Sequence, residues 1–165
     1  MTDFEIRCIR PEEGDAIVNI EQICFPPGVA ETREALLKRV ALISDLFIVA
    51  VEKNSGRVVA YLNGVPTSRE HFCDEFFSDY SLYDENGGSI MLLGLGVLPE
   101  YRGRGIARSL MMYYQKKQKE CGRKKLFLTC QEDKVGMYQN MNFQDLGIAN
   151  SSWGGKVWHE MVCEL

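Results

Sequence analysis

The chain has 165 residues, 45% of them hydrophobic, which suits one domain with a full core, so we expect a single domain over residues 1–165. Its formal net charge of −4 gives no support for nucleic-acid binding. No apolar run approaches the roughly 18–20 residues of a membrane span, and residues 1–5 lack the basic and apolar regions of a signal peptide, so we expect a soluble cytoplasmic protein without a membrane partner.

The first half of the chain alternates between strand and helix patterns. Apolar residues at helical spacing predict a helix over residues 12–25, which Pro26 ends, and Thr32 is placed to cap a second helix over residues 32–44. The other predicted segments are a strand over residues 4–9, a hairpin over residues 45–64, and a helix and loop over residues 67–88. The aromatic side chains of this last stretch either line an acceptor site or pack on the sheet.

The second half opens with residues 89–98, which contain no titratable side chain and predict a central strand buried on both faces. Gly94 and Gly96 are unexpected there, because a glycine in a strand often marks a bulge or a close approach by another backbone. The segments that follow are a helix over residues 105–121, a strand over 124–130, a short helix over 134–140 and two closing strands. This order predicts a mixed α/β sheet that a C-terminal hairpin closes.

A glycine-rich turn joins the central strand to the next helix. A helix start leaves about four backbone N–H groups unpaired and carries roughly half a positive charge, so such a turn can hold an anion. Gly103 and Gly105 remove side chains that would keep a phosphate from the backbone, and Arg102, Arg104 and Arg108 add positive charge. The turn therefore predicts a phosphorylated ligand, most simply a pyrophosphate.

The turn does not fit two other kinds of phosphate-binding loop. The turn lacks the Lys-Ser or Lys-Thr of a nucleoside-triphosphate loop, and it stands too late in the chain for a dinucleotide-binding fold. An ordinary glycine turn before a surface helix is the alternative that the residues leave open.

Six cysteines and two histidines, His71 and His159, are scattered along the chain, and no pair of cysteines has C-x-x-C spacing. We therefore expect reduced thiols and no metal site.

Residues 102–107, Arg-Gly-Arg-Gly-Ile-Ala, fit the pattern R/Q-x-x-G-x-G/A, and this segment resembles the acyl-coenzyme A pyrophosphate motif of the GNAT N-acetyltransferase superfamily. Residues 129–139, followed by Phe143, resemble the second cofactor segment of that family. In finer detail, residues 20–25, 93–97 and 160–165 resemble the arylalkylamine (serotonin) N-acetyltransferase branch. The resemblance extends over most of the chain, from about residue 20 to the end.

The resemblance implies a GNAT-like fold, with a central, mostly antiparallel mixed sheet of about seven strands, flanked by about four helices and splayed between strands 4 and 5. It also implies acetyl-CoA as the cosubstrate and no metal. The implied cofactor-binding residues are Leu95, Gly96 and Val97 for the pantetheine arm, Arg102, Gly103, Arg104, Gly105, Ile106, Ala107 and Arg108 for the pyrophosphate, and Tyr138.

Acetyl transfer to an amine needs a neutral nucleophile, a donor for the developing oxyanion and a proton for the departing thiolate. A backbone N–H near Leu95 is the candidate oxyanion donor. Tyr138 matches the family tyrosine, so we assign it as the acid that protonates the sulfur of CoA. Without the resemblance, a core aromatic is the favoured interpretation of this tyrosine.

The general base is where the chain departs from the arylalkylamine pattern. That branch carries two histidines on the central strand, and Met91 and Leu93 stand at those positions. Glu21 is our candidate for the base, and an exposed helical glutamate is the plainer interpretation of the same residue. His71 is a weaker candidate.

The acceptor is expected to be a small primary amine, aryl or alkyl, with Phe25 and Pro26 lining its pocket. Residues 1–98 contain 8 Lys and Arg against 16 Asp and Glu, whereas residues 99–165 contain 11 against 7. The acidic half can attract a cationic acceptor and the basic half an anionic cofactor. The alternatives are an acetyltransferase for protein N-termini or lysines and a CoA-binding module without catalysis. A homodimer is compatible with the sequence.

Overall fold

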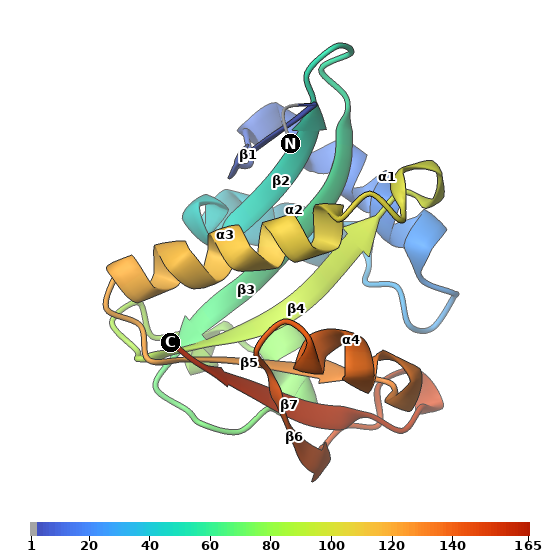
Figure 1. Cartoon of the computed structure of the whole chain (residues 1–165). Coiled ribbons are helices and arrows are strands. Elements are labelled where there is room, and N and C mark those ends of the chain that lie inside the picture. The colour runs from blue at the N-terminus through green and yellow to red at the C-terminus, as the bar shows by residue number, and fades with distance from the viewer. Residues whose placement is uncertain (1–2) are drawn as a thin grey trace. The chain divides into compact units, whose positions relative to one another are not determined.

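The computed structural model describes residues 3–165; Met1 and Thr2, which fall within the predicted domain, lie outside the described residues. The described chain forms seven strands and four α-helices (Figure 1). In chain order these are β1 (Phe4–Cys8), α1 (Gly14–Cys24), α2 (Arg33–Leu42), β2 (Phe47–Glu52), β3 (Val58–Thr67), β4 (Ser89–Val97), α3 (Ile106–Glu120), β5 (Lys125–Cys130), α4 (Val135–Gln139), β6 (Gln144–Ile148) and β7 (His159–Glu164).

The strands form one sheet in the order β1-β2-β3-β4-β5-β7-β6. β4 and β5 are parallel, whereas β1–β2, β2–β3, β5–β7 and β6–β7 are antiparallel. The mixed α/β sheet predicted from the sequence is therefore confirmed. The register between β4 and β5 pairs Ser89 with Lys125 through Met91 with Phe127. This ladder is shorter than either strand, which agrees with the splay predicted for strands 4 and 5.

The chain divides into two compact units. The first comprises the described residues up to Asn63 together with Gly94–Tyr113, and the second comprises Gly64–Leu93 together with Tyr114–Leu165. β3, β4 and α3 contribute residues to both units.

In the first unit, helices cover both faces of the sheet. Val49 and Tyr61 are directly paired on β2 and β3, so they share a face. The Tyr61 hydroxyl donates a hydrogen bond to Glu21, which places α1 over this face. Ala50 points to the opposite face, where it lines a small cavity with Ile106 of α3. The start of α3 and α1 therefore lie on opposite faces.

The second helix begins where the sequence predicts, because the Thr32 side chain accepts a hydrogen bond from the Ala35 N–H at 3.2 Å. Its buried face contains a charged residue beside the aliphatic Leu36 and Val40. Arg39 is fully buried, and its guanidinium donates to both oxygens of the buried Glu31 carboxylate, at 2.6 and 2.8 Å. An ion pair thus forms part of the core here.

In the second unit, the prediction of a helix within residues 67–88 is wrong. The structure has two short 3₁₀ turns there, Asp74–Phe77 and Tyr80–Leu82. The Asp79 carboxylate accepts from the N–H and the hydroxyl of Ser81, and such local bonds compete with helix formation. The aromatic residues mainly serve packing, because Phe72 and Phe76 are buried.

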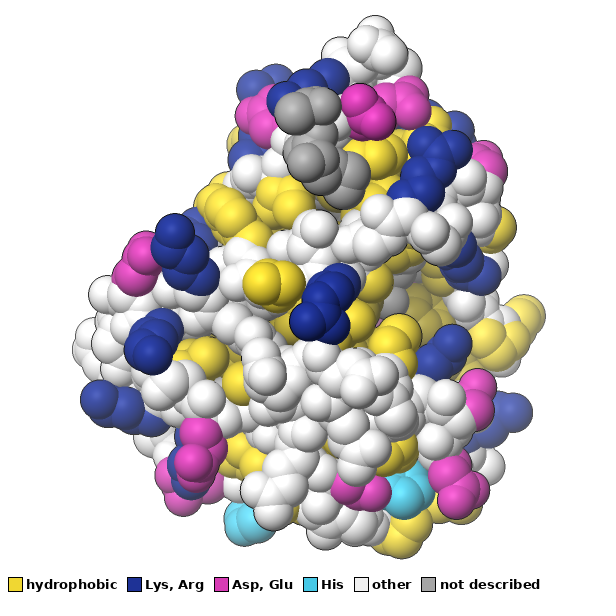
Figure 2. Space-filling model, in the orientation of Figure 1, with side chains coloured by type: hydrophobic (Ala, Val, Ile, Leu, Met, Phe, Trp, Pro, Cys, Tyr) yellow, Lys and Arg dark blue, Asp and Glu magenta, His cyan; other side chains and the backbone are white. Residues whose placement is uncertain are grey.

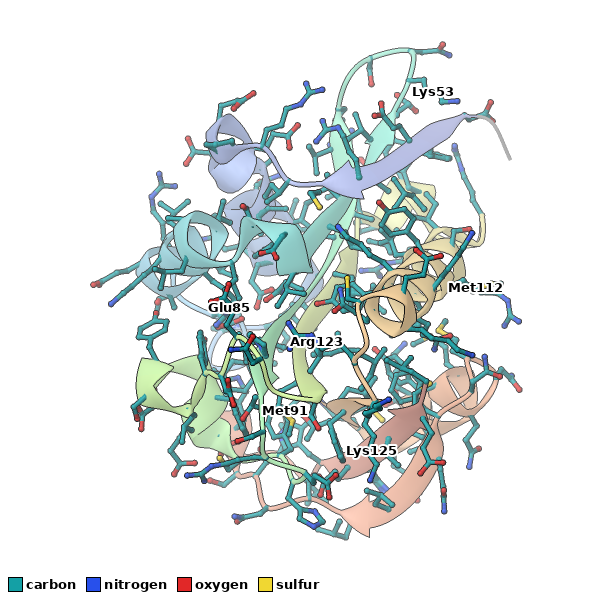
Figure 3. The ribbon with its side chains drawn as sticks, turned by 90° about the vertical axis from the view of Figure 1, so that its left-hand side faces the viewer. Lys53, Glu85, Met91, Met112, Arg123 and Lys125 are labelled. Carbon is teal, nitrogen blue, oxygen red and sulfur yellow. The ribbon has the colours of Figure 1, made fainter. Side chains whose placement is uncertain are left out.

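Gly87, just before β4 in the second unit, lies where the chain passes close to Thr67. A Cβ on Gly87 would lie 2.1 Å from the carbonyl carbon of Thr67, so no other residue fits without moving the backbone. The Arg123 guanidinium donates a hydrogen bond to the Gly87 carbonyl. Figure 3 labels Arg123, and it also labels Met91 of β4. Met91 is buried within the sheet.

Among residues 3–165, no helix combines the length and apolar character needed to cross a bilayer. The face drawn in Figure 2 mixes basic, acidic and hydrophobic side chains, and its Lys and Arg side chains are scattered.

The ion pair in the first unit leads to a stability prediction. Glu31→Ala leaves the buried Arg39 charge without its carboxylate, and removing one partner of a buried pair costs about 3–5 kcal/mol. We expect a loss of this size in the free energy of unfolding measured by urea denaturation. The matched control is Arg33→Ala, which breaks the exposed Arg33–Asp15 pair and should change stability little. Equal losses in the two variants would contradict the assignment.

Candidate active site

The glycine-rich turn has the backbone conformation that its residues require. Gly103 and Gly105 have φ angles of 78° and 77°, in the left-handed region that favours glycine. A Cβ on either residue would have no neighbour within 4 Å, so conformation and not crowding requires glycine here. The Ser109 N–H bonds to the Gly105 carbonyl at 3.0 Å, so the turn leads directly into the backbone hydrogen bonding of α3.

The arginines of the turn contact their own chain in different ways. Arg102 Nε donates to the Val97 carbonyl at 3.0 Å, and its Nη2 lies 3.5 Å from Cys24 Sγ. The Arg104 guanidinium lies 5.1 Å from the ring centroid of Tyr101, a cation–π contact. Both side chains are exposed at the protein surface. Anion binding by Arg102 can therefore use its remaining N–H groups without breaking the bond to β4.

Two further predicted cofactor residues of this turn point partly or wholly inward. Ile106 is buried and lines the small cavity on the α3 face, and Ala107 is half-buried. Their backbone N–H groups are the part that can serve an anion at the helix start. Arg108 is exposed on the first turn of α3.

β4 is less buried than the sequence predicts. Its first four residues are buried, but Leu93, Gly94, Leu95 and Val97 are half-exposed. Backbone groups at the end of this strand are therefore nearer to solvent than those of a strand buried on both faces.

The two glycines of β4 make room for a side chain, whereas the sequence suggests a bulge or another backbone. A Cβ on Gly96 would lie 2.8 Å from Cε1 of Tyr61, and a Cβ on Gly94 would lie 3.2 Å from the Tyr61 ring and from Asn63 Nδ2. Any larger residue would collide with this aromatic ring. The glycines are thus explained by the packing of Tyr61 across β4.

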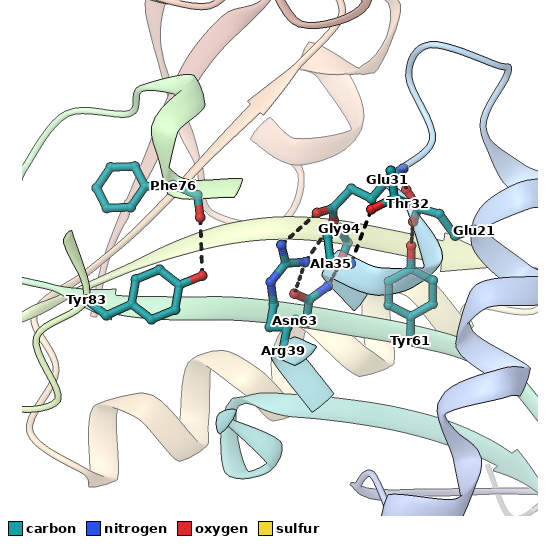
Figure 4. Close-up of polar contacts among 10 residues, drawn as sticks. All are labelled: Glu21, Glu31, Thr32, Ala35, Arg39, Tyr61, Asn63, Phe76, Tyr83 and Gly94. Atoms are coloured by element: carbon teal, nitrogen blue, oxygen red, sulfur yellow. Dashed lines mark hydrogen bonds and ion pairs between the residues drawn. The ribbon is translucent and has the colours of Figure 1, made fainter. Parts of the chain in front are cut away.

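Glu21 belongs to a buried polar network, which Figure 4 draws. Its carboxylate accepts from the Tyr61 hydroxyl and from the Glu31 N–H, the latter at 2.9 Å. The side chain is buried, so the interpretation of Glu21 as an exposed helical glutamate is wrong. Burial raises the pKa of Glu21, and the two hydrogen bonds oppose the shift.

The same network contains residues that the sequence analysis did not select. Asn63 lies between the Arg39 guanidinium, 3.3 Å from its Oδ1, and the Gly94 carbonyl, 3.5 Å from its Nδ2. Burial is the main cause that raises the pKa of Tyr61 well above its usual value of 10.0. A signal was present in the sequence, since Asn63 is a polar residue in an otherwise apolar strand pattern.

The predicted acceptor residues lie just beyond Glu21. The Phe25 N–H bonds to the Glu21 carbonyl at 3.0 Å and ends α1. The Pro26 carbonyl accepts from Val29 and Ala30, both at 3.0 Å, and forms a tight turn. Phe25 is half-buried and Pro26 is exposed, so both can contact a small molecule. The first unit thus contains Glu21, the acceptor residues, Leu95–Val97 and the glycine turn.

Tyr138 lies in the second unit, on α4. Its ring packs edge-on against Phe143 with centroids 5.9 Å apart, and the residue is half-buried. Burial, and secondarily the charge of Cys130, raise the pKa of Tyr138. Burial likewise raises the pKa of Cys130 to about 11. Tyr138 therefore keeps its proton near neutral pH, as an acid must.

The histidines also belong to the second unit. His71 is exposed, with Nδ1 3.6 Å from a Glu160 carboxylate oxygen. His159 Nδ1 lies 3.1 Å from both carboxylate oxygens of Asp145. Both histidines thus have acidic neighbours of their own within this unit.

Comparison with known proteins identifies relatives over most of the chain. Residues 14–143 match the model of the acetyltransferase (GNAT) family. The chain is 29% identical over 145 residues to an acetyltransferase of Pectobacterium atrosepticum, covering 86% of this chain and 88% of that protein.

Two solved structures have a similar fold. The GphF GNAT-like decarboxylase in complex with isobutyryl-CoA has a TM-score of 0.82 and 17% identity, covering 97% of this chain and 98% of that chain. The PaiA N-acetyltransferase of Thermoplasma acidophilum in complex with coenzyme A has a TM-score of 0.72 and 15% identity, covering 98% and 99%. The predicted superfamily is confirmed, and the arylalkylamine branch is not.

The burial of Glu21 has a consequence for stability. Because its pKa is raised above the ordinary value of 4.5, the folded chain holds this proton to higher pH than the unfolded chain does. The contribution is complete below about pH 4.5 and is lost as the pH rises through the raised pKa. Relative to Glu21→Gln, we expect wild-type stability to fall with rising pH, by at most about 1.4 kcal/mol per pH unit.

Urea denaturation at a series of pH values measures this difference. In Tyr61→Phe the hydrogen bond that lowers the pKa of Glu21 is lost, so the fall should move to higher pH. A wild-type stability that instead rises with pH relative to Glu21→Gln would show that Glu21 favours the ionised form.

Proposed function

The chain belongs to the GNAT acetyltransferase family, and from this premise we propose that it transfers the acetyl group of acetyl-CoA to a small primary amine, aryl or alkyl, by direct attack in a ternary complex. The observation that carries the proposal is the glycine turn between β4 and α3. Its two left-handed glycines, its helix start and its exposed arginines suit a pyrophosphate group.

The donor side of the reaction rests on backbone groups and Tyr138. The pantetheine arm would bind along the backbone of Leu95–Val97, with the Leu95 N–H donating to the thioester oxygen as it becomes an oxyanion. When the C–S bond breaks, the Tyr138 hydroxyl gives its proton to the CoA thiolate. The Tyr138 hydroxyl carries its proton at neutral pH, as donation to the thiolate requires.

The acceptor side rests on Glu21. An alkylammonium has a pKa near that of lysine, about 10.4, so it must lose a proton before it attacks. We place Glu21 at the end of this transfer, because its raised pKa makes it a stronger base than an exposed carboxylate. Glu21 and Tyr61 are both buried, so this transfer requires that the bound amine open a path to the Tyr61 oxygen. That oxygen then takes the ammonium proton as the Tyr61 proton passes to Glu21, so that Tyr61 stays neutral throughout. The very high pKa of Tyr61 supports a relay without a tyrosinate.

Cofactor binding by the turn can be tested with a matched pair of glycine substitutions. Gly105→Asp places a carboxylate beside the expected phosphates, and we predict at least about a tenfold loss of acetyl-CoA affinity. Gly56→Asp is the control, because Gly56 has a similar φ of 72° and equally open surroundings in the β2–β3 hairpin. Calorimetric titration measures both, and equal affinities in the two variants would reject the phosphate turn.

Acetyl transfer can be tested by thiol release from acetyl-CoA with a panel of acceptors. We expect turnover with small primary amines and none with the N,N-dimethyl analogue of the best one, because its nitrogen, once acylated, has no proton to lose and so forms no amide. Tyr138→Phe should lower kcat about a hundredfold with the same amine. Turnover with peptides alone would indicate a protein acetyltransferase, and acetyl-CoA binding without turnover would indicate a binding module.

A further inference from the structure

We propose that Asn63 is a positioning residue for this reaction: its amide orients the peptide between Gly94 and Leu95, and so aims the Leu95 N–H at the thioester oxygen. The inference rests on the proposed function, in which this N–H is the oxyanion donor. The contacts that carry it all lie within the first unit.

The first step is the geometry of one peptide group. Asn63 Nδ2 donates to the Gly94 carbonyl at 3.5 Å. The Gly94 C=O and the Leu95 N–H belong to the same planar trans peptide, so they point in opposite directions. Holding the carbonyl therefore fixes the direction of the N–H.

The second step is the direction itself. The Leu98 N–H of the same chain segment bonds to the Val59 carbonyl of β3 at 2.9 Å. Backbone groups alternate sides along a strand, so Gly94 also turns its polar groups toward β3 and Leu95 turns its own away. The register of β4 with β5 ends at Met91, four residues earlier, which leaves the Leu95 N–H for a ligand.

The third step is the orientation of the Asn63 amide. Its Oδ1 accepts from Arg39 Nη1 at 3.3 Å. A flipped amide would set its NH₂ against the guanidinium and its oxygen against the Gly94 carbonyl, so only one orientation satisfies both neighbours. Arg39 is itself fixed by two hydrogen bonds to Glu31 (Figure 4). The orientation of the Asn63 amide thus derives from a buried ion pair.

The fourth step is the space around Gly94. The Tyr61 hydroxyl and ring lie 3.2 Å from the position of a Gly94 Cβ, so this face of β4 is closed by the ring beside the Asn63 amide. A leucine at position 63 would have the same branched shape without burying polar groups, which cost free energy unless they are paired. The amide is therefore explained by what it holds.

The decisive variant is Asn63→Asp, which keeps an acceptor for Arg39 and replaces the donor to Gly94 by an oxygen that repels the carbonyl. We expect kcat to fall at least about tenfold, since losing an oxyanion donor outright costs about 10²–10³, while the Kd of CoA changes less than about threefold. Asn63→Leu, which keeps the branched shape and removes the donor, provides the same comparison should Asn63→Asp not fold.

The matched control is Thr67→Val on the same strand. Thr67 is buried, and its hydroxyl donates to the Leu82 carbonyl at 2.9 Å and accepts from the Arg69 N–H at 3.1 Å, so the variant loses two hydrogen bonds of a buried side chain away from Gly94, as Asn63→Leu does at position 63. It should lower the thermal midpoint and leave kcat unchanged. A fall in kcat of equal size in both variants would reduce Asn63 to a structural residue and overturn the inference.

A second readout, free of turnover, is the Leu95 amide resonance in ¹⁵N-labelled protein titrated with acetyl-CoA. The inference requires a large shift in wild type and a reduced one in Asn63→Asp. Equal shifts would overturn the positioning role while leaving the proposed function intact. No shift in wild type would overturn the oxyanion assignment and this inference with it.

Discussion

The buried ion pair between Arg39 and Glu31 is the interaction on which the first unit depends. A guanidinium in the core must be neutralised and hydrogen-bonded, and once it is, its geometry is restrictive. Glu31 also gives its backbone N–H to Glu21, and Arg39 also binds Asn63, which reaches β4. One pair therefore links both helices, the loop between them and two strands. An apolar core of the same volume would allow these elements to slide, because its contacts have no direction.

The charges of this network do not balance within it. Glu21 and Glu31 are two carboxylates, and Arg39 is a single guanidinium bound to Glu31. Glu21 must therefore hold a proton or share its charge with hydrogen-bond donors, and its raised pKa records that tension. The ionised form of Glu21, whose charge is not neutralised by Arg39 while Arg39 binds Glu31, is the form that can take the proton of the proposed cationic acceptor. The proposed reaction and the charge balance of the core thus both favour the transfer of a proton to Glu21.

The sequence predicts what depends on local rules. The Thr32 cap, the prolines that end α1 and the glycine turn before α3 were predictable because each follows from the conformation of a few neighbouring residues. Arg39 and Asn63 were not, because helical and strand periodicity assign charged and polar residues to the surface, and their partners are distant in sequence. The prediction of a helix within residues 67–88 was wrong for a related reason. Local hydrogen bonds from side chains to nearby groups, such as those of Asp79 with Ser81, form there in place of a helix. Gly94 and Gly96 are unusual in a strand and so stand out in the sequence, but only the fold shows that the Tyr61 ring requires them.

The packing of Tyr61 across Gly94 and Gly96 also has an evolutionary consequence. The Tyr61 ring occupies the space that side chains at positions 94 and 96 would need, so the sizes of the residues at these three positions depend on one another. A lineage that acquired a side chain at position 96 would first need a smaller residue at position 61, and losing the hydroxyl would leave Glu21 without its donor. Changes here must therefore come in a set order, and the glycines should vary together with Tyr61 among relatives.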